Sequence, residues 1–190
     1  GALLALSLPF WDRLTLVFNG LGQHVSSFEG REAVRGLVAF MMLCLPATLM
    51  GLTFPLLLTR VVRYAGVGRL VGRLTAVNTT GAVTGSLITG YLVLPALGSQ
   101  RVLGASAVIF ALLGVATALS RRSRLKGAAL ALTALTFGAV VLAPRWDLGR
   151  LTSGSNVYFV SDPPPDELLM MEEDVHGGFT TVARRKDVLT

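Results

Sequence analysis

Long apolar runs fill most of the first three quarters of the chain. Four of them follow one another without a charged residue and contain 24, 27, 19 and 18 residues: 36–59, 74–100, 102–120 and 127–144. A hydrocarbon core about 30 Å thick needs about 20 helical residues to cross it. The pattern therefore predicts an all-α transmembrane helical bundle of about four spanning helices within residues 34–144.

The fourth run is the shortest, and it leaves two structures open. Its 18 residues can span the membrane if the bilayer thins around it or if flanking side chains reach the interface. A re-entrant segment, which enters and leaves on the same side, is the alternative.

Residues 1–33 mix apolar positions with charges. Asp12, Arg13, Glu29 and Arg31 interrupt this stretch. It is expected to be an interfacial or connecting segment, with Phe10 and Trp11 as candidate anchors at the headgroup level.

The pattern changes after residue 144. Residues 145–166 are rich in turn formers, including the Pro163–Pro165 run, and are expected to form a linker. Two alternating segments follow, ELLMMEE (167–173) and FTTVARR (179–185), with Gly177 and Gly178 between them. They predict the first β-hairpin of a truncated soluble domain over residues 167–190, because a two-stranded hairpin alone is marginal in water.

Composition and charge agree with this division. Hydrophobic residues make up 52% of the chain, charged residues 15%, and the mean hydropathy is +0.63, which is typical of a membrane protein. The net charge of +6 divides into +9 for residues 1–144 and −3 for the remainder. Because the arginines lie in short loops between apolar runs, they indicate bilayer orientation, and no nucleic-acid partner is expected.

Several residues in the runs suggest packing. Gly81 and Gly85 have the four-residue spacing common at crossings of transmembrane helices, which predicts a helix contact there. Pro46 and Pro55 are expected to kink the first helix. Asn78 is interpreted as an interfacial or interhelical hydrogen-bonding residue. The single cysteine, Cys44, is expected to be a buried small hydrophobe.

Candidate chemistry is sparse in the 190 residues. None of the four runs contains an ionisable Asp, Glu, Lys, Arg or His, which argues against an ion-coupled pathway through them. His24 and His176 lack metal-site or catalytic spacing, and His176 is interpreted as an exposed loop residue. No nucleotide-binding or hydrolase motif occurs. The sequence therefore assigns no catalytic, cofactor-binding or metal-binding residue.

Four segments, taken in order, resemble a known family. They are LPATLMGLTFPLLLTR, GRLTAVNTTGAVTGSLITGYLVLPALG, WDLGRLTSG and EEDVHGGFTTVARR. This order is similar to that of bacterial fused major-facilitator-like and spermidine synthase-like membrane proteins, from about Leu37 onward. One departure is Phe179-Thr180-Thr181, which stands near the position of a Tyr-Gln pair typical of soluble spermidine synthases, so the acceptor amine is left open.

The resemblance implies a membrane-anchored aminopropyltransferase-like enzyme of polyamine biosynthesis. Its donor substrate would be decarboxylated S-adenosylmethionine, its acceptor a small-molecule amine, and the residues that bind them would follow Thr190. The protein would be a multi-pass protein of the bacterial inner membrane, with the lipid bilayer as its partner. The alternative is a transporter-like or structural membrane protein whose synthase-like domain is not catalytic. The oligomeric state is not predicted.

Loop charges predict the orientation. Residues 60–73 and 121–126 each carry four Lys or Arg, whereas the short connection between the second and third runs, GSQR (98–101), offers only Arg101. Basic loops tend to lie in the cytoplasm, so four spans would place residues 145–190 outside it. A cytoplasmic donor would favour the opposite side, which a re-entrant fourth run allows. The charge pattern favours the extracytoplasmic tail.

Overall fold

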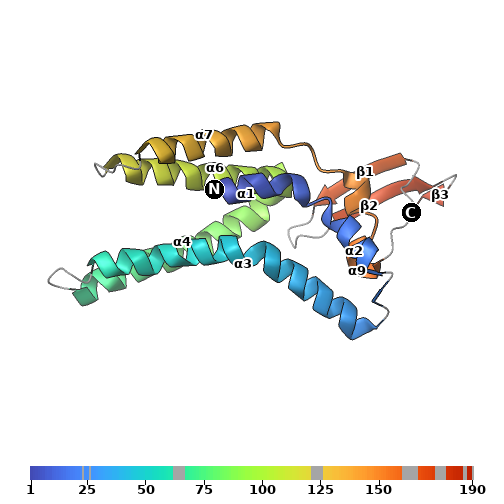
Figure 1. The fold of residues 1–190 in the computed structure, drawn as a ribbon, viewed down its shortest axis with the longest axis horizontal. Coiled ribbons are helices and arrows are strands. Elements are labelled where there is room, and N and C mark those ends of the chain that lie inside the picture. The colour runs from blue at the N-terminus through green and yellow to red at the C-terminus, as the bar shows by residue number, and fades with distance from the viewer. Residues whose placement is uncertain are drawn as a thin grey trace.

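The chain folds into a helical bundle with a small sheet at one end (Figure 1). The structure, a computed structural model, describes residues 1–22, 24–25, 27–61, 67–120, 126–159, 167–173, 179–185 and 188–189. Within these described residues, three helical elements are long and apolar enough to cross a membrane: Phe28–Thr59, Gly68–Leu97 and Ser99–Ser120. These elements are compatible with a multi-pass integral membrane protein.

The first long helix, α3 (Phe28–Val61), begins near the sheet and runs away from it. Pro46 and Pro55 lie inside it, and the helix assignment continues through both. The chain returns toward the sheet end through α4 (Val67–Ile88), which lies beside α3 in Figure 1.

A widened turn continues the returning helix. A π-helical turn, η2 (Thr89–Val93), links α4 to the short α5 (Leu94–Leu97). Pro95 lies in the first turn of α5 and has no backbone N–H to donate, which fits the local loss of regular α-helical bonding. The element ends at Gly98, whose φ of 77° is accessible to glycine at little cost.

The turn at Gly98 lies within the connection expected between the second and third runs, GSQR (98–101). Helix α6 (Ser99–Ser120) begins directly after the glycine, and Arg101 lies in its first turn. Positive φ, rather than charge, sets the boundary here.

Helices α6 and α7 (Lys126–Leu142) form a close antiparallel pair. The Thr133 hydroxyl donates to the Ala111 carbonyl across the pair at 3.2 Å. Nearer the sheet end, Gly104 faces Val140, and a Cβ on the glycine would lie 3.0 Å from Val140 Cγ1. Helix α7 is a shorter apolar helix of 17 residues, and it runs along α6 as an unbroken helix.

Three short N-terminal helices precede the bundle: α1 (Ala2–Ser7), η1 (Leu8–Phe10) and α2 (Leu14–Gly22). Helix α1 packs against both α6 and α7. Ala5 and Leu8 are buried by this packing, at 0% and 1% exposure. The Trp11 indole donates to the Ser7 hydroxyl at 3.1 Å, while Phe10 is exposed.

In the described residues after the bundle, two short helices are followed by three strands: α8 (Leu148–Leu151), α9 (Ser155–Tyr158), β1 (Glu167–Glu173), β2 (Phe179–Arg185) and β3 (Val188–Leu189). The strands form an antiparallel sheet in the order β1-β2-β3. The predicted antiparallel hairpin is thus confirmed with the bounds expected from the sequence. The connection with Gly177 and Gly178 lies outside the described residues, as does the Pro163–Pro165 run.

Burial differs from two expectations. Among the described residues, no heavy atom of another segment lies within 4 Å of a Cβ built on Gly81 or Gly85, so the predicted helix crossing is absent there. Cys44 is exposed on α3 rather than buried. An apolar helix face can meet lipid as readily as protein, so an apolar sequence does not by itself predict burial inside the protein.

Candidate functional site

The best-built polar region is the junction where the bundle meets the C-terminal segment. It comprises the start of α6, the N-terminal helices, the first turns of α3 and residues 144–159. These segments are distant in sequence and meet at the sheet end of the bundle (Figure 1).

The Gln100 side chain forms hydrogen bonds with the segment that follows α7. Its Nε2 donates to the Pro144 carbonyl at 2.7 Å, and its Oε1 accepts from the Trp146 backbone N–H at 3.1 Å. One side-chain amide at the start of α6 thus satisfies two backbone groups just after the end of α7. This pairing aligns the two helix ends.

Trp146 joins the same segment to the N-terminal helices. Its indole Nε1 donates to the Leu8 carbonyl at 2.8 Å. The next residue, Asp147, donates its backbone N–H to the Asp12 carboxylate at 3.3 Å. The Asp147 side chain also caps α8 by accepting from the Arg150 backbone N–H at 3.2 Å. Residues 146–150 are therefore held by specific hydrogen bonds.

Phe159 is the buried centre of a second cluster at the junction. Its exposure is 1%, and its ring lies edge-on to Phe18 of α2, with centroids 5.4 Å apart and planes at 71°. Two guanidinium groups from α3 lie over the ring, with Arg31 Cζ 5.7 Å and Arg35 Cζ 5.4 Å from its centroid. The cluster combines aromatic packing with two cation–π contacts.

Hydrogen bonds hold both arginines in place. Arg31 Nε donates to the Val25 carbonyl at 3.2 Å. Arg35 donates to the Val157 carbonyl and pairs with the Glu32 carboxylate one turn earlier on α3. Arg35 therefore contacts α9 through both a carbonyl and an aromatic ring, and links α3 directly to the C-terminal segment.

The Phe159 backbone is left-handed, with φ 58° and ψ 19°. Such a conformation costs a non-glycine residue about 1–3 kcal/mol and persists where the surroundings enforce it. Gly22 at the end of α2 permits the close packing of Phe159 in this conformation, since a Cβ at this position would overlap the Phe159 carbonyl oxygen. Only glycine allows this approach of the two backbones.

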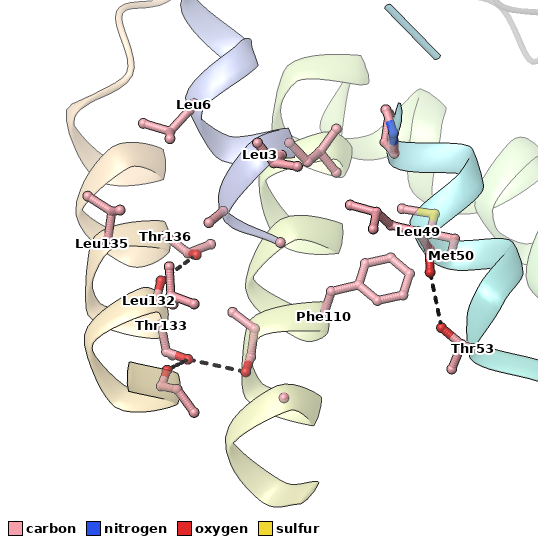
Figure 2. Close-up of a pocket in the computed structure, with 17 residues that line it drawn as sticks. Leu3, Leu6, Leu49, Met50, Thr53, Phe110, Leu132, Thr133, Leu135 and Thr136 are labelled. Carbon is pink, nitrogen blue, oxygen red and sulfur yellow. Dashed lines mark hydrogen bonds between the residues drawn. The ribbon is translucent and has the colours of Figure 1, made fainter. Parts of the chain in front are cut away.

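A separate cavity of about 590 Å³ lies within the bundle, between α1, α3, α6 and α7 (Figure 2). Its wall is apolar, with three threonines from α3 and α7 as its hydroxyl groups: Thr53, Thr133 and Thr136. Among the described lining residues, no side chain is an acid, a base or a thiol, and the ionisable group present is the α-amino group of Gly1. The cavity can accommodate an apolar group.

The polar residues that were considered as candidates in the sequence analysis do not come together in one site. Asn78 is exposed on α4, and His24 is exposed, with Nδ1 3.3 Å from the Gly20 carbonyl oxygen. His176 lies outside the described residues. Among the described residues, no group of three His, Cys, Asp or Glu side chains could hold a metal ion.

The junction residues lacked a recognisable sequence signal. Arg31 and Arg35 are four apart, which places them on one helix face, but this spacing does not identify Phe159 as their partner. Gln100 and Trp146 are 46 residues apart. Their pairing depends on the antiparallel arrangement of α6 and α7.

Comparison of the chain with protein-family models, curated protein sequences and solved structures finds no match in any of the three.

Proposed function

We propose that this chain is the membrane part of a spermidine synthase-like membrane protein, and that it holds the soluble domain in a defined position at the bilayer. The junction is the observation that carries this proposal. A flexible linker would leave residues 144–159 without specific partners, whereas Trp146 and Phe159 each contact the N-terminal half of the protein. Residues 144–159 therefore act as a rigid mount, which means that they hold the structure that follows them in a fixed position relative to the helical bundle.

The sheet has the form expected for the beginning of such a domain. Strands β1 and β2 pair from Glu167–Arg184 to Glu173–Phe179, with a register shift between Leu168 and Met170. Leu169 and Met170 expose large apolar side chains. A three-stranded sheet with exposed apolar side chains gains stability by packing against further structure. We propose that residues of a synthase-like domain pack against these exposed apolar side chains of the sheet.

In the proposed reaction, an acceptor amine attacks the methylene carbon beside the sulfonium of decarboxylated S-adenosylmethionine. A carbon–nitrogen bond forms, the carbon–sulfur bond breaks, the thioether leaves and a base takes the amine proton. The groups that carry out this step belong to the synthase-like domain. The role of the present chain is to anchor and orient that domain.

The proposed topology has four spans. Helix α7 runs antiparallel to α6 as an unbroken helix, which supports a span over a re-entrant segment. The two basic loops carry eight Lys or Arg and no acid, whereas the sheet end carries six Arg and four acids in residues 8–35, 98–101 and 143–159. The basic loops are therefore proposed to be cytoplasmic and the sheet extracytoplasmic.

This topology favours a second candidate function. A domain outside the cytoplasm lacks direct access to a donor made inside it. The alternative is a transporter-like or structural membrane protein with a non-catalytic synthase-like domain. The specific observation in its favour is that the sheet lies at the opposite end of the bundle from the helix ends that the basic loops connect, namely the end of α3, the start of α4, the end of α6 and the start of α7 (Figure 1).

Activity of the protein at its full natural length separates the two candidates. The protein, purified in lipid nanodiscs, is incubated with decarboxylated S-adenosylmethionine and a series of diamines, and products are followed by mass spectrometry. Formation of an aminopropylated amine together with one equivalent of thioether supports the enzyme. A folded protein that yields neither product with any diamine supports the non-catalytic alternative.

The mounting role has its own test. Spin labels at Leu37→Cys on α3 and Glu172→Cys on β1, in a Cys44→Ala background, report the distance between bundle and sheet. A narrow distance distribution is expected, and Phe159→Ala should broaden it because the buried ring is lost. A broad distribution in the parent protein would contradict the rigid mount.

A further inference from the structure

The cavity inside the bundle suggests a ligand that is independent of the junction and of any enzymatic activity. We propose that it is a binding site for one acyl chain of a membrane phospholipid. The cavity lies at mid-depth, since Phe110 is near the middle of α6 and Leu132 and Thr136 are near the middle of α7. A ligand at this depth is surrounded by hydrocarbon.

The chemistry of the wall selects an apolar ligand. The three threonine hydroxyls donate within the bundle: Thr53 to the Leu49 carbonyl at 3.4 Å, Thr133 to the Ala129 and Ala111 carbonyls at 2.9 and 3.2 Å, and Thr136 to the Leu132 carbonyl at 2.7 Å (Figure 2). A hydroxyl has one proton, so none of these donors is free for a ligand. No described side chain that lines the cavity is ionisable, and burial lowers the pKa of the Gly1 α-amino group, the ionisable group among the lining residues.

Water is a poor occupant of such a space. A cavity of about 590 Å³ is large enough for many water molecules, but buried water needs two to four polar partners. Apolar cavities stay dry and take up apolar molecules instead. The wall offers Leu49, Met50 and Phe110, which provide dispersion contacts with alkyl groups.

The size and openness of the cavity favour an alkyl chain over a helix. A helix about 10 Å across would occupy 590 Å³ with only about one and a half turns, so the space suits a narrower chain. Leu6, Leu49 and Leu132 line the cavity and are 47–54% exposed. This apolar rim gives a lipid chain a lateral entry from the bilayer.

Photolabelling tests the proposal directly. The protein, at its full natural length, is placed in nanodiscs that contain a phosphatidylcholine with a diazirine at mid-chain, and labelled residues are mapped by mass spectrometry. Phe110 and Leu132 in the cavity should be labelled several-fold more strongly than Leu112 and Leu119, which are exposed on the same helix pair. Equal labelling would show bulk lipid contact only and overturn the proposal.

A filling substitution supplies the control. Gly114 lines the cavity, and a Cβ there meets no described atom within 4 Å, so Gly114→Leu should fill the cavity without a clash. Gly81→Leu is matched, since Gly81 has equally open surroundings and lies outside the cavity. Gly114→Leu should reduce the labelling of Phe110 and Leu132 several-fold, and Gly81→Leu should not.

Ala129→Leu is a second filling variant for use if Gly114→Leu does not fold. Filling variants that fold and leave the labelling unchanged would overturn the proposal. Absence of label in the cavity of the parent protein, with Leu112 labelled, would show that the space is closed or filled by protein, and would also overturn it. Aminopropyl transfer is not measured here, so the outcome is independent of the proposed function.

Discussion

The indole Nε1 of Trp146 donates a 2.8 Å hydrogen bond to the carbonyl oxygen of Leu8, 138 residues earlier in the chain. Leu8 is almost completely buried, at 1% exposure, beside α6. The bond therefore joins the segment after the last bundle helix to the segment before the first long one. It ties the N-terminal helices to the segment that leads from the bundle to the sheet.

Trp146→Phe should lower the stability of the junction. The substitution keeps the aromatic ring but leaves the Leu8 carbonyl without this donor, at a cost of about 1–3 kcal/mol if water cannot replace it. Trp11→Phe is the matched control, because in the described part of the chain the Trp11 indole N–H donates to the Ser7 hydroxyl one turn away rather than to a distant segment. Thermal unfolding in detergent should show a larger fall in Tm for Trp146→Phe. Equal effects would argue against the long-range bond.

Gly22→Ala should destabilise the junction by about 1–3 kcal/mol through overpacking, because the new Cβ would overlap the Phe159 carbonyl. Gly20→Ala, in the same helix, meets open space and should be neutral or stabilising by about 0.5–1 kcal/mol. Denaturant unfolding of both variants provides the comparison. Equal stability of the two variants would show that Phe159 does not approach α2 as described.

Arg35 and Phe159 should be energetically coupled. A double-mutant cycle with Arg35→Ala and Phe159→Ala isolates their interaction, which is expected to be about 0.5–2 kcal/mol for a partly desolvated cation–π pair. Glu32→Ala, measured alone, controls for loss of the local ion pair on α3. Strict additivity of the two alanine substitutions would contradict the contact.

Gly104→Leu should separate α6 from α7, because even a Cβ at Gly104 lies only 3.0 Å from Val140 Cγ1. A cost of at least about 1–3 kcal/mol is expected for forcing a larger side chain into this contact. Gly85→Leu should leave the bundle unchanged, since its surroundings are open among the described residues. Thermostability in detergent distinguishes the two variants. A larger loss of thermostability for Gly85→Leu than for Gly104→Leu would contradict the open surroundings of Gly85 and would indicate a helix crossing there.

The sheet should be accessible from outside the cell. Glu172 is exposed on β1, and Glu172→Cys in a Cys44→Ala background should react with a membrane-impermeant maleimide in intact cells. Gly68→Cys, at the opposite end of the bundle, should react only after permeabilisation. The reverse pattern would place the sheet in the cytoplasm and favour the enzyme over the non-catalytic candidate.

Local properties of the sequence were sufficient for the element types. The absence of charge over lengths near 20 residues predicted the long helices, since a bilayer selects for length and apolarity. Alternation and flanking glycines predicted β1 and β2 with their observed bounds. The break between the second and third runs lies within the expected connection 98–101, where Gly98 with positive φ ends the helix.

Only the tertiary structure decided which faces of these elements meet protein. Phe159 packs on Phe18 and two arginines, while Gly81 and Gly85 face open space, and neither arrangement follows from local spacing. The physical reason is that a bilayer and a protein interior both accept apolar side chains, so hydrophobicity does not distinguish a lipid-facing surface from a packed one. Contacts between distant segments depend on how the helices are paired, which the pattern along the chain does not specify.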